Sequence, residues 1–293
     1  MRIIAQNLSC VYSEKSKSLA VKALNNITLT IEEGEFFGII GKTGSGKSTF
    51  IQHLNGLIPV QKDRGSLLVG EYNLTDKKPD FKGLRANVGM VFQYPEHQLF
   101  AETVFDDVAF GIKNFMPETP PEKIAQMVEN AIVAVGLNYG EIKDKSPFEL
   151  SGGQKRRVAI AGVIVTRPQV LVLDEPAAGL DPQGKREFLS LLKRLHKDFI
   201  KTIILVSHDM NLVAEYCTSV AVFNDGYLVK NGTPKEVFAD EEMLKNAGLE
   251  LPTTEKLTLA LKKKGIDLKN DLTVDSFINA IVEKFSNKGG DSL

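Results

Sequence analysis

One stretch constrains the fold of this chain more than any other. An apolar run, "FFGII" at 36–40, leads directly into "GKTGSGKS" at 41–48 and then into a helical pattern. The octapeptide fits G-x-x-x-x-G-K-[ST], whose glycines leave backbone N–H groups open to phosphate oxygens. A strand before such a loop and a helix after it are typical of a sheet buried on both faces. The sequence therefore predicts an α/β core with a phosphate-binding loop.

Within this loop, Lys47 is predicted to reach the β and γ oxygens of a bound phosphate chain, and Ser48 to coordinate Mg²⁺. A chance Gly/Ser loop is the alternative, which the flanking strand and helix oppose. The residues expected to bind the phosphates are Gly41, Lys42, Thr43, Gly44, Ser45, Gly46, Lys47, Ser48 and Thr49.

Polar residues follow other apolar runs of the chain. "VLVLDE" ends in Asp174 and Glu175, and α/β sheets place ligands at the carboxyl ends of their strands. Asp174 is predicted to hold the metal directly or through water, and Glu175 to polarise the attacking water as general base. The alternative for both carboxylates is a solvated strand end.

Three further residues are weaker candidates when each is taken alone. His208, in "VSHD", would sit level with Asp174 if their strands share a sheet, and Gln93, after "VGMVF", has an amide within reach of the metal or the water. Tyr12 offers a flat ring to adenine. A structural histidine, a surface glutamine and a half-buried core tyrosine are the respective alternatives.

A second candidate anion site stands far from the first. In "LSGGQKRR" at 150–157, a serine and two glycines precede a helical pattern, so a positive helix end and open N–H groups would face an anion. An ordinary serine-capped helix is the alternative. The residues concerned are Ser151, Gly152, Gly153 and Gln154.

The composition excludes some partners. With 36 basic and 37 acidic residues, the charge balance favours neither nucleic acid nor a polybasic membrane anchor. Cys10 and Cys217 are far apart, as in a reduced cytosolic protein, and no chemistry is assigned to them. The chain begins without a signal-peptide pattern, and its apolar runs are shorter than the about 18 residues of a membrane span, so we expect neither export nor membrane crossing.

The pattern along the chain predicts several parts. Residues 1–32 alternate as antiparallel strands, a helical stretch at about 104–166 interrupts the α/β core, and apolar positions at helical spacing recur in 252–286. The last residues, "SNKGGDSL", are expected to be disordered.

Taken in order, "GKTGSGKS", the Gln after a strand, "LSGGQ", "VLVLDE", "GLD" and "SH" closely resemble the ATP-binding cassette (ABC) ATPases over residues 3 to about 240. The resemblance implies a P-loop NTPase with a RecA-like core, an antiparallel β subdomain, and ATP and Mg²⁺ as cofactors. It implies an ATPase domain at 1–247, with a helical subdomain at roughly 95–166 inserted, and a C-terminal helical module at 248–293. Because two cassettes pack head to tail in this family, Ser151 and Gly153 would hold the γ-phosphate bound by the other subunit, and Asp181 would touch across the interface.

A narrower resemblance rests on "FQYPEHQLFAETVFDDVAFGIKN" and on the tail "LPTTEKLTLALKKKGIDL". Both are similar to the ATPases of energy-coupling factor importers of vitamins and transition metals, and "YPEHQLF" is more like the second of their paired ATPases. This implies a peripheral subunit on the cytoplasmic face of the membrane, a transmembrane coupling protein, a substrate-capturing membrane subunit and a second ATPase, paralogous or identical. The tail would dimerise or simply pack.

The segment "YPEHQLF" is expected to dock on the coupling protein, with Glu96 and His97 as polar contacts and Leu99 and Phe100 as apolar surface. In the alternative, Leu99 and Phe100 are core residues. Three alternative functions remain: the ATPase of another ABC importer type, a soluble ABC protein acting on nucleic acid or ribosomes, and a degenerate ATP-binding subunit. The single motif set and the absence of sustained heptads oppose the second, and intact Lys47, Glu175 and His208 oppose the third.

Overall fold

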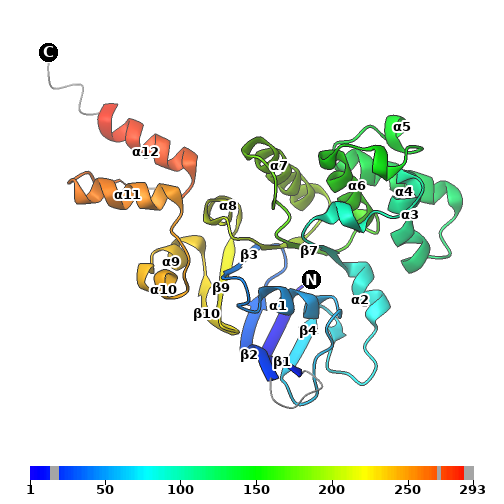
Figure 1. Cartoon of the computed structure of the whole chain (residues 1–293), viewed down its shortest axis with the longest axis horizontal. Coiled ribbons are helices and arrows are strands. Elements are labelled where there is room, and N and C mark those ends of the chain that lie inside the picture. The colour runs from blue at the N-terminus through cyan, green and yellow to red at the C-terminus, as the bar shows by residue number, and fades with distance from the viewer. Residues whose placement is uncertain (14–19, 269–271, 287–293) are drawn as a thin grey trace.

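The computed structural model describes residues 1–13, 20–268 and 272–286. Its strands form two sheets, a four-stranded one in the order β2-β1-β4-β5 and a six-stranded one in the order β10-β9-β3-β8-β7-β6 (Figure 1). The predicted α/β class is confirmed.

The smaller sheet is antiparallel, as predicted for the first part of the chain. Ile3 of β1 pairs with Ile31 of β2 and with Val69 of β4, and all three side chains are buried. One face of the sheet therefore closes on the core. Its strands are β1 (Ile3–Ser13), β2 (Ala20–Ile31), β4 (Ser66–Val69) and β5 (Tyr72–Asn73).

The larger sheet is parallel except for β10, which pairs antiparallel with β9 through a tight hairpin. Asp225 and Gly226 both adopt positive φ there (49° and 80°), the backbone that a two-residue hairpin turn requires. Every residue of β3 and β8 is buried, as the continuous apolar runs predict. Its strands are β3 (Phe36–Gly41), β6 (Val88–Val91), β7 (Val170–Asp174), β8 (Thr202–Val206), β9 (Ser219–Asn224) and β10 (Tyr227–Gly232).

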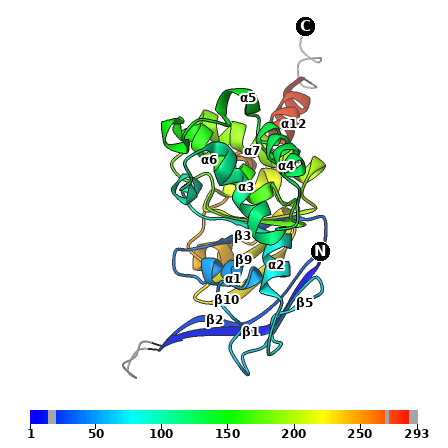
Figure 2. The same cartoon turned by 90° about the vertical axis from the view of Figure 1, so that its right-hand side faces the viewer.

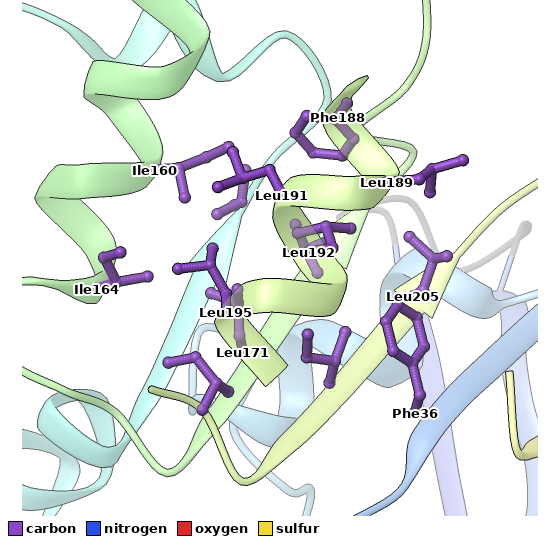
Figure 3. Close-up of a cluster of buried hydrophobic side chains, with 14 of the residues drawn as sticks. Phe36, Ile160, Ile164, Leu171, Phe188, Leu189, Leu191, Leu192, Leu195 and Leu205 are labelled. Carbon is purple, nitrogen blue, oxygen red and sulfur yellow. The ribbon is translucent and has the colours of Figure 1, made fainter. Parts of the chain in front are cut away.

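Helices cover both faces of the larger sheet. Helix α1 (Lys47–Leu54) lies between the two sheets (Figure 2), where Phe50, Ile51 and Leu54 are fully buried. On the opposite face, α7 packs against α6 and the sheet. Figure 3 shows the cluster that joins these helices to Leu171 of β7 and Leu205 of β8. The remaining helices of the core are α2 (Phe81–Asn87), α7 (Pro182–Asp198), α8 (Met210–Tyr216), α9 (Pro234–Phe238) and α10 (Glu241–Asn246).

A group of helices lies at one end of the larger sheet (Figure 1). Thr103 caps α3 by accepting a hydrogen bond from the Asp106 N–H, and Ser151 caps α6 in the same way through Gln154. The group comprises η1 (Pro95–Gln98), α3 (Val104–Phe115), α4 (Pro121–Ala134), α5 (Tyr139–Ile142), η2 (Pro147–Glu149) and α6 (Gly152–Ile164).

Two helices, α11 (Thr253–Lys263) and α12 (Val274–Ser286), follow the core and project from it (Figure 1). The Thr254 Oγ1 hydroxyl donates to the Leu272 carbonyl at 2.6 Å and ties the start of one helix to the approach of the other. The disorder expected for 286–293 is wrong for Ser286, which ends α12, and 287–293 lie outside the described residues. Across 1–13, 20–268 and 272–286, no helix combines the length and apolarity that crossing a membrane requires.

Candidate functional site

The loop after β3 is folded tightly around its own lysine. Lys47 Nζ donates to the carbonyl oxygens of Gly41 and Lys42, at 2.7 and 2.8 Å. A Cβ on Gly41 would lie 2.3 Å from the Phe223 carbonyl oxygen, at a φ of 152°, so only glycine fits there. Burial lowers the pKa of Lys47, and the carboxylates of Glu175 and Asp174 oppose that shift. The ammonium group is thus held inside the loop beside two acidic groups.

The loop fits a phosphate group. Ser45 Oγ is buried and has no hydrogen-bond partner within the part of the chain that the structure describes. A buried hydroxyl without a partner is uncommon in folded proteins, and an anion at this position would satisfy it. The start of α1 directs further backbone N–H groups to the same place. These features suit the phosphates of a nucleotide.

The two adjacent carboxylates lie at the end of β7 beside the loop. Asp174 shares a hydrogen bond with Ser48, which offsets part of the rise that burial causes in the pKa of Asp174. Glu175 adopts a left-handed backbone, φ 48°, and its N–H donates to the Val206 carbonyl at 3.1 Å. A non-glycine residue held at positive φ is strained, and such residues concentrate at functional sites.

The structure brings His208 to Glu175. Strands β7 and β8 are neighbours in which Asp174 pairs with Val206, so the condition set for His208 is met. His208 Nε2 lies 2.5 Å from Glu175 Oε1. Gln93 is exposed two residues beyond β6, the strand next to β7, and so lies at the same sheet edge. The Tyr12 hydroxyl is 3.3 Å from Thr49 Oγ1, which places its exposed ring beside the phosphate loop.

The "LSGGQ" residues belong to a different part of the molecule, where α6 begins in the helical group (Figure 1). Ser151 Oγ accepts from the Gln154 N–H, and the Ser151 N–H donates to Gln154 Oε1 at 3.0 Å. A Cβ on Gly152 or Gly153 would meet no described atom within 4 Å, so their backbone is open. Asp181 caps α7, accepting from the Gly184 N–H at 2.7 Å. The serine is a cap, and the backbone of the two glycines is open, as a second anion site at this position would require.

The predicted docking segment needs a correction. Leu99 is only 8% exposed and packs in the core, so the prediction that its side chain presents apolar surface is wrong. Glu96 forms an ion pair with Arg156. The alternative of a core residue holds for Leu99 but not for Phe100, which is 60% exposed. The physical reason is that η1 ends at Gln98 and Leu99 is extended (φ −78°, ψ 131°), and successive side chains of an extended chain point in opposite directions.

A groove beside η1 is lined in part by the same segment, through Gln98, Leu99 and Phe100. It has a volume of about 370 Å³ and is mainly apolar. Phe100 and Phe110 meet edge to face in it, 4.9 Å between ring centroids, and both are exposed. Gln98 Oε1 is buried there without a hydrogen-bond partner among the described residues. An apolar groove with one unsatisfied acceptor is suited to a helix of another protein.

Two charged pairs near the site escaped the sequence analysis. Arg156 joins Glu96 and the Ala178 carbonyl, and Lys185 Nζ lies 3.3 Å from Asp209 Oδ2 next to His208. Arg156 carried one usable signal: at four-residue spacing from Ile160, a charged side chain falls on the buried face of α6. The Lys185 pair joins different elements and has no such signal.

Comparison with known proteins identifies the family. Residues 24–178 match the family model described as ABC transporter, and a curated energy-coupling factor transporter ATP-binding protein, EcfA2 of Clostridioides difficile, is 46% identical over 99% of both chains. The chain belongs to the ABC transporter family, in its energy-coupling factor branch. A second EcfA2 from this branch, of Acetivibrio thermocellus, is 48% identical over 93% of this chain and 94% of its own.

Solved structures of ABC cassettes share the fold. The cbiO1 protein of Clostridium perfringens, described as part of the ABC transporter complex cbiONQ, superposes with a TM-score of 0.68 and 38% identity over 87% of this chain and 97% of its own. The ATP-binding cassette MJ0796, solved as a dimer in a post-hydrolysis state with ADP and phosphate, gives 0.69 and 27% identity over 79% and 98%. The fold is therefore that of an ATP-hydrolysing cassette.

Proposed function

We propose that this chain is the ATP-hydrolysing subunit of an energy-coupling factor importer, and that it works as one half of a head-to-tail pair of cassettes. One observation carries the proposal: the chain has two surfaces suited to phosphate, in different regions. The loop at 41–48 encloses its own lysine and has a buried hydroxyl without a partner among the described residues, whereas the start of α6 offers two glycines with an open backbone. Each surface completes the other when two such chains face each other.

Hydrolysis follows from the positions of the side chains. Lys47 and the loop N–H groups bind the β- and γ-phosphates, and the Tyr12 ring, beside Thr49, stacks on adenine. Water attacks the γ-phosphorus, Glu175 accepts its proton, and the bond to the ADP oxygen breaks. His208, in contact with Glu175, holds that carboxylate in place. The products are ADP and inorganic phosphate.

The donor set also fits Mg²⁺, which prefers oxygen ligands. Ser48 and Asp174, already hydrogen-bonded to each other, would hold the ion with the amide oxygen of Gln93. When bound, the ion neutralises charge on the phosphate oxygens.

The second cassette supplies the other half of each site. Ser151, Gly152, Gly153 and Gln154 bind the γ-phosphate held by the partner chain, and Asp181 contacts that chain across the interface. The open backbone of both glycines supports this role, since a helix start with exposed N–H groups attracts an anion. The partner is a paralogous ATPase, or a second copy of this chain.

The C-terminal module, residues 248–293, contributes to pairing. Helix α12 exposes Val274, Ile278 and Val282 at four-residue spacing, with Phe285 beside them. Such a stripe in a water-soluble helix is suited to a helix of similar pattern. The module is thus a dimerisation element appended to an ATPase domain at 1–247, into which the helical subdomain at about 95–166 is inserted.

The apolar groove beside η1 binds the transmembrane coupling protein, which in turn holds a substrate-capturing subunit. This binding keeps the chain on the cytoplasmic face of the membrane as a peripheral subunit. The groove borders Gln93 through Phe92, so a partner seated there lies close to the nucleotide site. The exposed Phe100 and Phe110 rings supply the contact area.

The test is purification of the tagged chain from native membranes, with mass spectrometry of what stays attached. We expect a second cassette protein and an integral membrane protein. The variant Phe100→Ser/Phe110→Ser is expected to retain the second cassette and lose the membrane protein, and Ile278→Ser/Val282→Ser to weaken the hold on the second cassette. Recovery with a soluble solute-binding protein would support another importer type, and recovery with ribosomes or nucleic acid would refute the transport function.

A further inference from the structure

One buried arginine joins three segments that the sequence keeps far apart. Arg156, on α6, donates from Nε and Nη2 to the two carboxylate oxygens of Glu96 on η1, both at 3.2 Å. Its Nη2 also donates to the Ala178 carbonyl, at 3.2 Å. Ala178 lies in the loop of residues 175–181, which runs from the predicted general base to the predicted trans contact Asp181. The guanidinium therefore connects the edge of the docking groove to the catalytic loop.

The environment makes this connection strong. The Arg156 side chain is only 7% exposed, and its remaining nitrogen, Nη1, is buried without a hydrogen-bond partner among the described residues. A planar fork that binds a carboxylate through two nitrogens also fixes the orientation of its partner. Removing either partner leaves an uncompensated buried charge. Glu96 and Ala178 are thus bound to the same rigid group.

The anchor of the arginine does not move easily. Arg156, Ile160 and Ile164 follow one another at four-residue spacing along α6, and Figure 3 shows the two isoleucines beside Leu191 and Leu195 of α7. Close-packed interiors transmit displacement rather than absorbing it. The segments that Arg156 holds are, by contrast, the short helix η1 and the 175–181 loop.

A second contact runs parallel to the first. The Tyr94 ring, just before η1, lies near Gly179, where a Cβ would be 3.7 Å from Tyr94 Cε1. Within the loop, the Ala178 N–H donates to the Glu175 carbonyl at 3.0 Å, so Ala178 and Glu175 share one turn. A displacement of Ala178 is therefore a displacement of the backbone that carries the base.

We propose that Arg156 is a positioning residue for ATP hydrolysis: it fixes the 175–181 loop to η1, so that a partner seated in the groove sets the position of Glu175. This inference rests on the proposed function. Arg156 acts through Ala178 and touches no reacting atom. The proposal predicts that weakening the hydrogen bonds from the Arg156 guanidinium slows the chemical step and leaves ATP binding unchanged.

The test uses the assembled complex purified from membranes. Arg156→Lys keeps the charge but lacks the fork that spans Glu96 and Ala178 together. We expect kcat to fall about tenfold while KM for ATP stays within about twofold, and the backbone amides of residues 177–180 to exchange hydrogen faster. The matched control is Arg157→Lys, the adjacent arginine, which pairs with exposed Glu187 instead and should change neither quantity.

The outcomes are decisive. Equal kcat and equal loop protection in Arg156→Lys and Arg157→Lys would overturn the proposal, as would parallel loss of ATP binding, kcat and thermal stability, which marks a purely structural arginine. Should Arg156→Lys fail to fold, the double variant Glu96→Gln/Arg156→Gln, which leaves no buried charge, replaces it with the same expected result. Glu175→Gln in the same assay tests the proposed function separately, since its failure would not depend on Arg156.

Discussion

Replacing Glu175 by glutamine removes a proton acceptor and almost nothing else. The two side chains have the same shape, the backbone hydrogen bond from Glu175 to Val206 is unaffected, and an amide can still contact His208. Lys47 and the loop that binds phosphate lie on a different strand end and keep their contacts. Because a positioned general base contributes about 10²–10⁴-fold, the barrier should rise by about 2.7–5.5 kcal/mol.

The assay is phosphate release by the assembled complex at saturating ATP, with ATP affinity measured by equilibrium binding on the same sample. Glu175→Gln is expected to bind ATP within about threefold of the wild type and to hydrolyse it at least about 100-fold more slowly. Glu187→Gln, an exposed carboxylate on α7, is the matched control and should hydrolyse ATP normally. Turnover of Glu175→Gln close to that of the control would show that Glu175 is not the base.

Three further predictions concern stability, pH and the phosphate loop. Leu192 is fully buried in the cluster of Figure 3, so Leu192→Ala should lower the free energy of unfolding of the protein by about 2–5 kcal/mol, measured by urea titration. A decrease below about 1 kcal/mol would contradict that packing. Burial acts to raise the pKa of Glu96, but the hydrogen bonds from Arg156 outweigh it and lower the pKa below 4.5. The wild type should therefore be more stable than Glu96→Gln above that pH, and this difference in unfolding free energy should disappear as the pH falls through the lowered pKa. A pH-independent difference in unfolding free energy between the two proteins would contradict this. Gly41→Ala should weaken ATP binding at least about tenfold, because its Cβ meets the Phe223 carbonyl at 2.3 Å, and unchanged affinity in a nucleotide titration would refute the tight loop.

The elements with a strong local pattern could be predicted from the sequence. The phosphate loop depends on glycine positions within eight residues, and buried parallel strands appear as short apolar runs, so β3, β7 and β8 were all foreseen. Placing His208 level with Asp174 needed one assumption, that their strands share a sheet, and the observed pairing of Asp174 with Val206 confirms it. Local spacing was sufficient to predict the site residues that directly follow a buried strand.

The remaining features depend on contacts between distant segments. Arg156 and Glu96 are 60 residues apart, and neither residue type nor spacing announces their pairing. Whether the Leu99 side chain points into the core or into solvent depends on η1, a short 3-10 helix that begins after Tyr94 at φ 58°. A shift of one residue in the extended chain after η1 would exchange the buried and the exposed side chains. The sequence therefore located the segment that borders the groove, predicted the exposed Phe100 and misassigned Leu99.

The central claim is that each ATP is held by the phosphate loop of one chain and the α6 start of the other. Ser151→Arg tests it most directly, by photolabelling each subunit of the purified complex with an azido-ATP and resolving the two chains by mass. The account predicts that the mutated chain labels normally at its own loop, whereas the partner chain loses hydrolysis of the ATP it holds. Loss of label from the mutated chain, with the partner's site fully active, would contradict the head-to-tail arrangement.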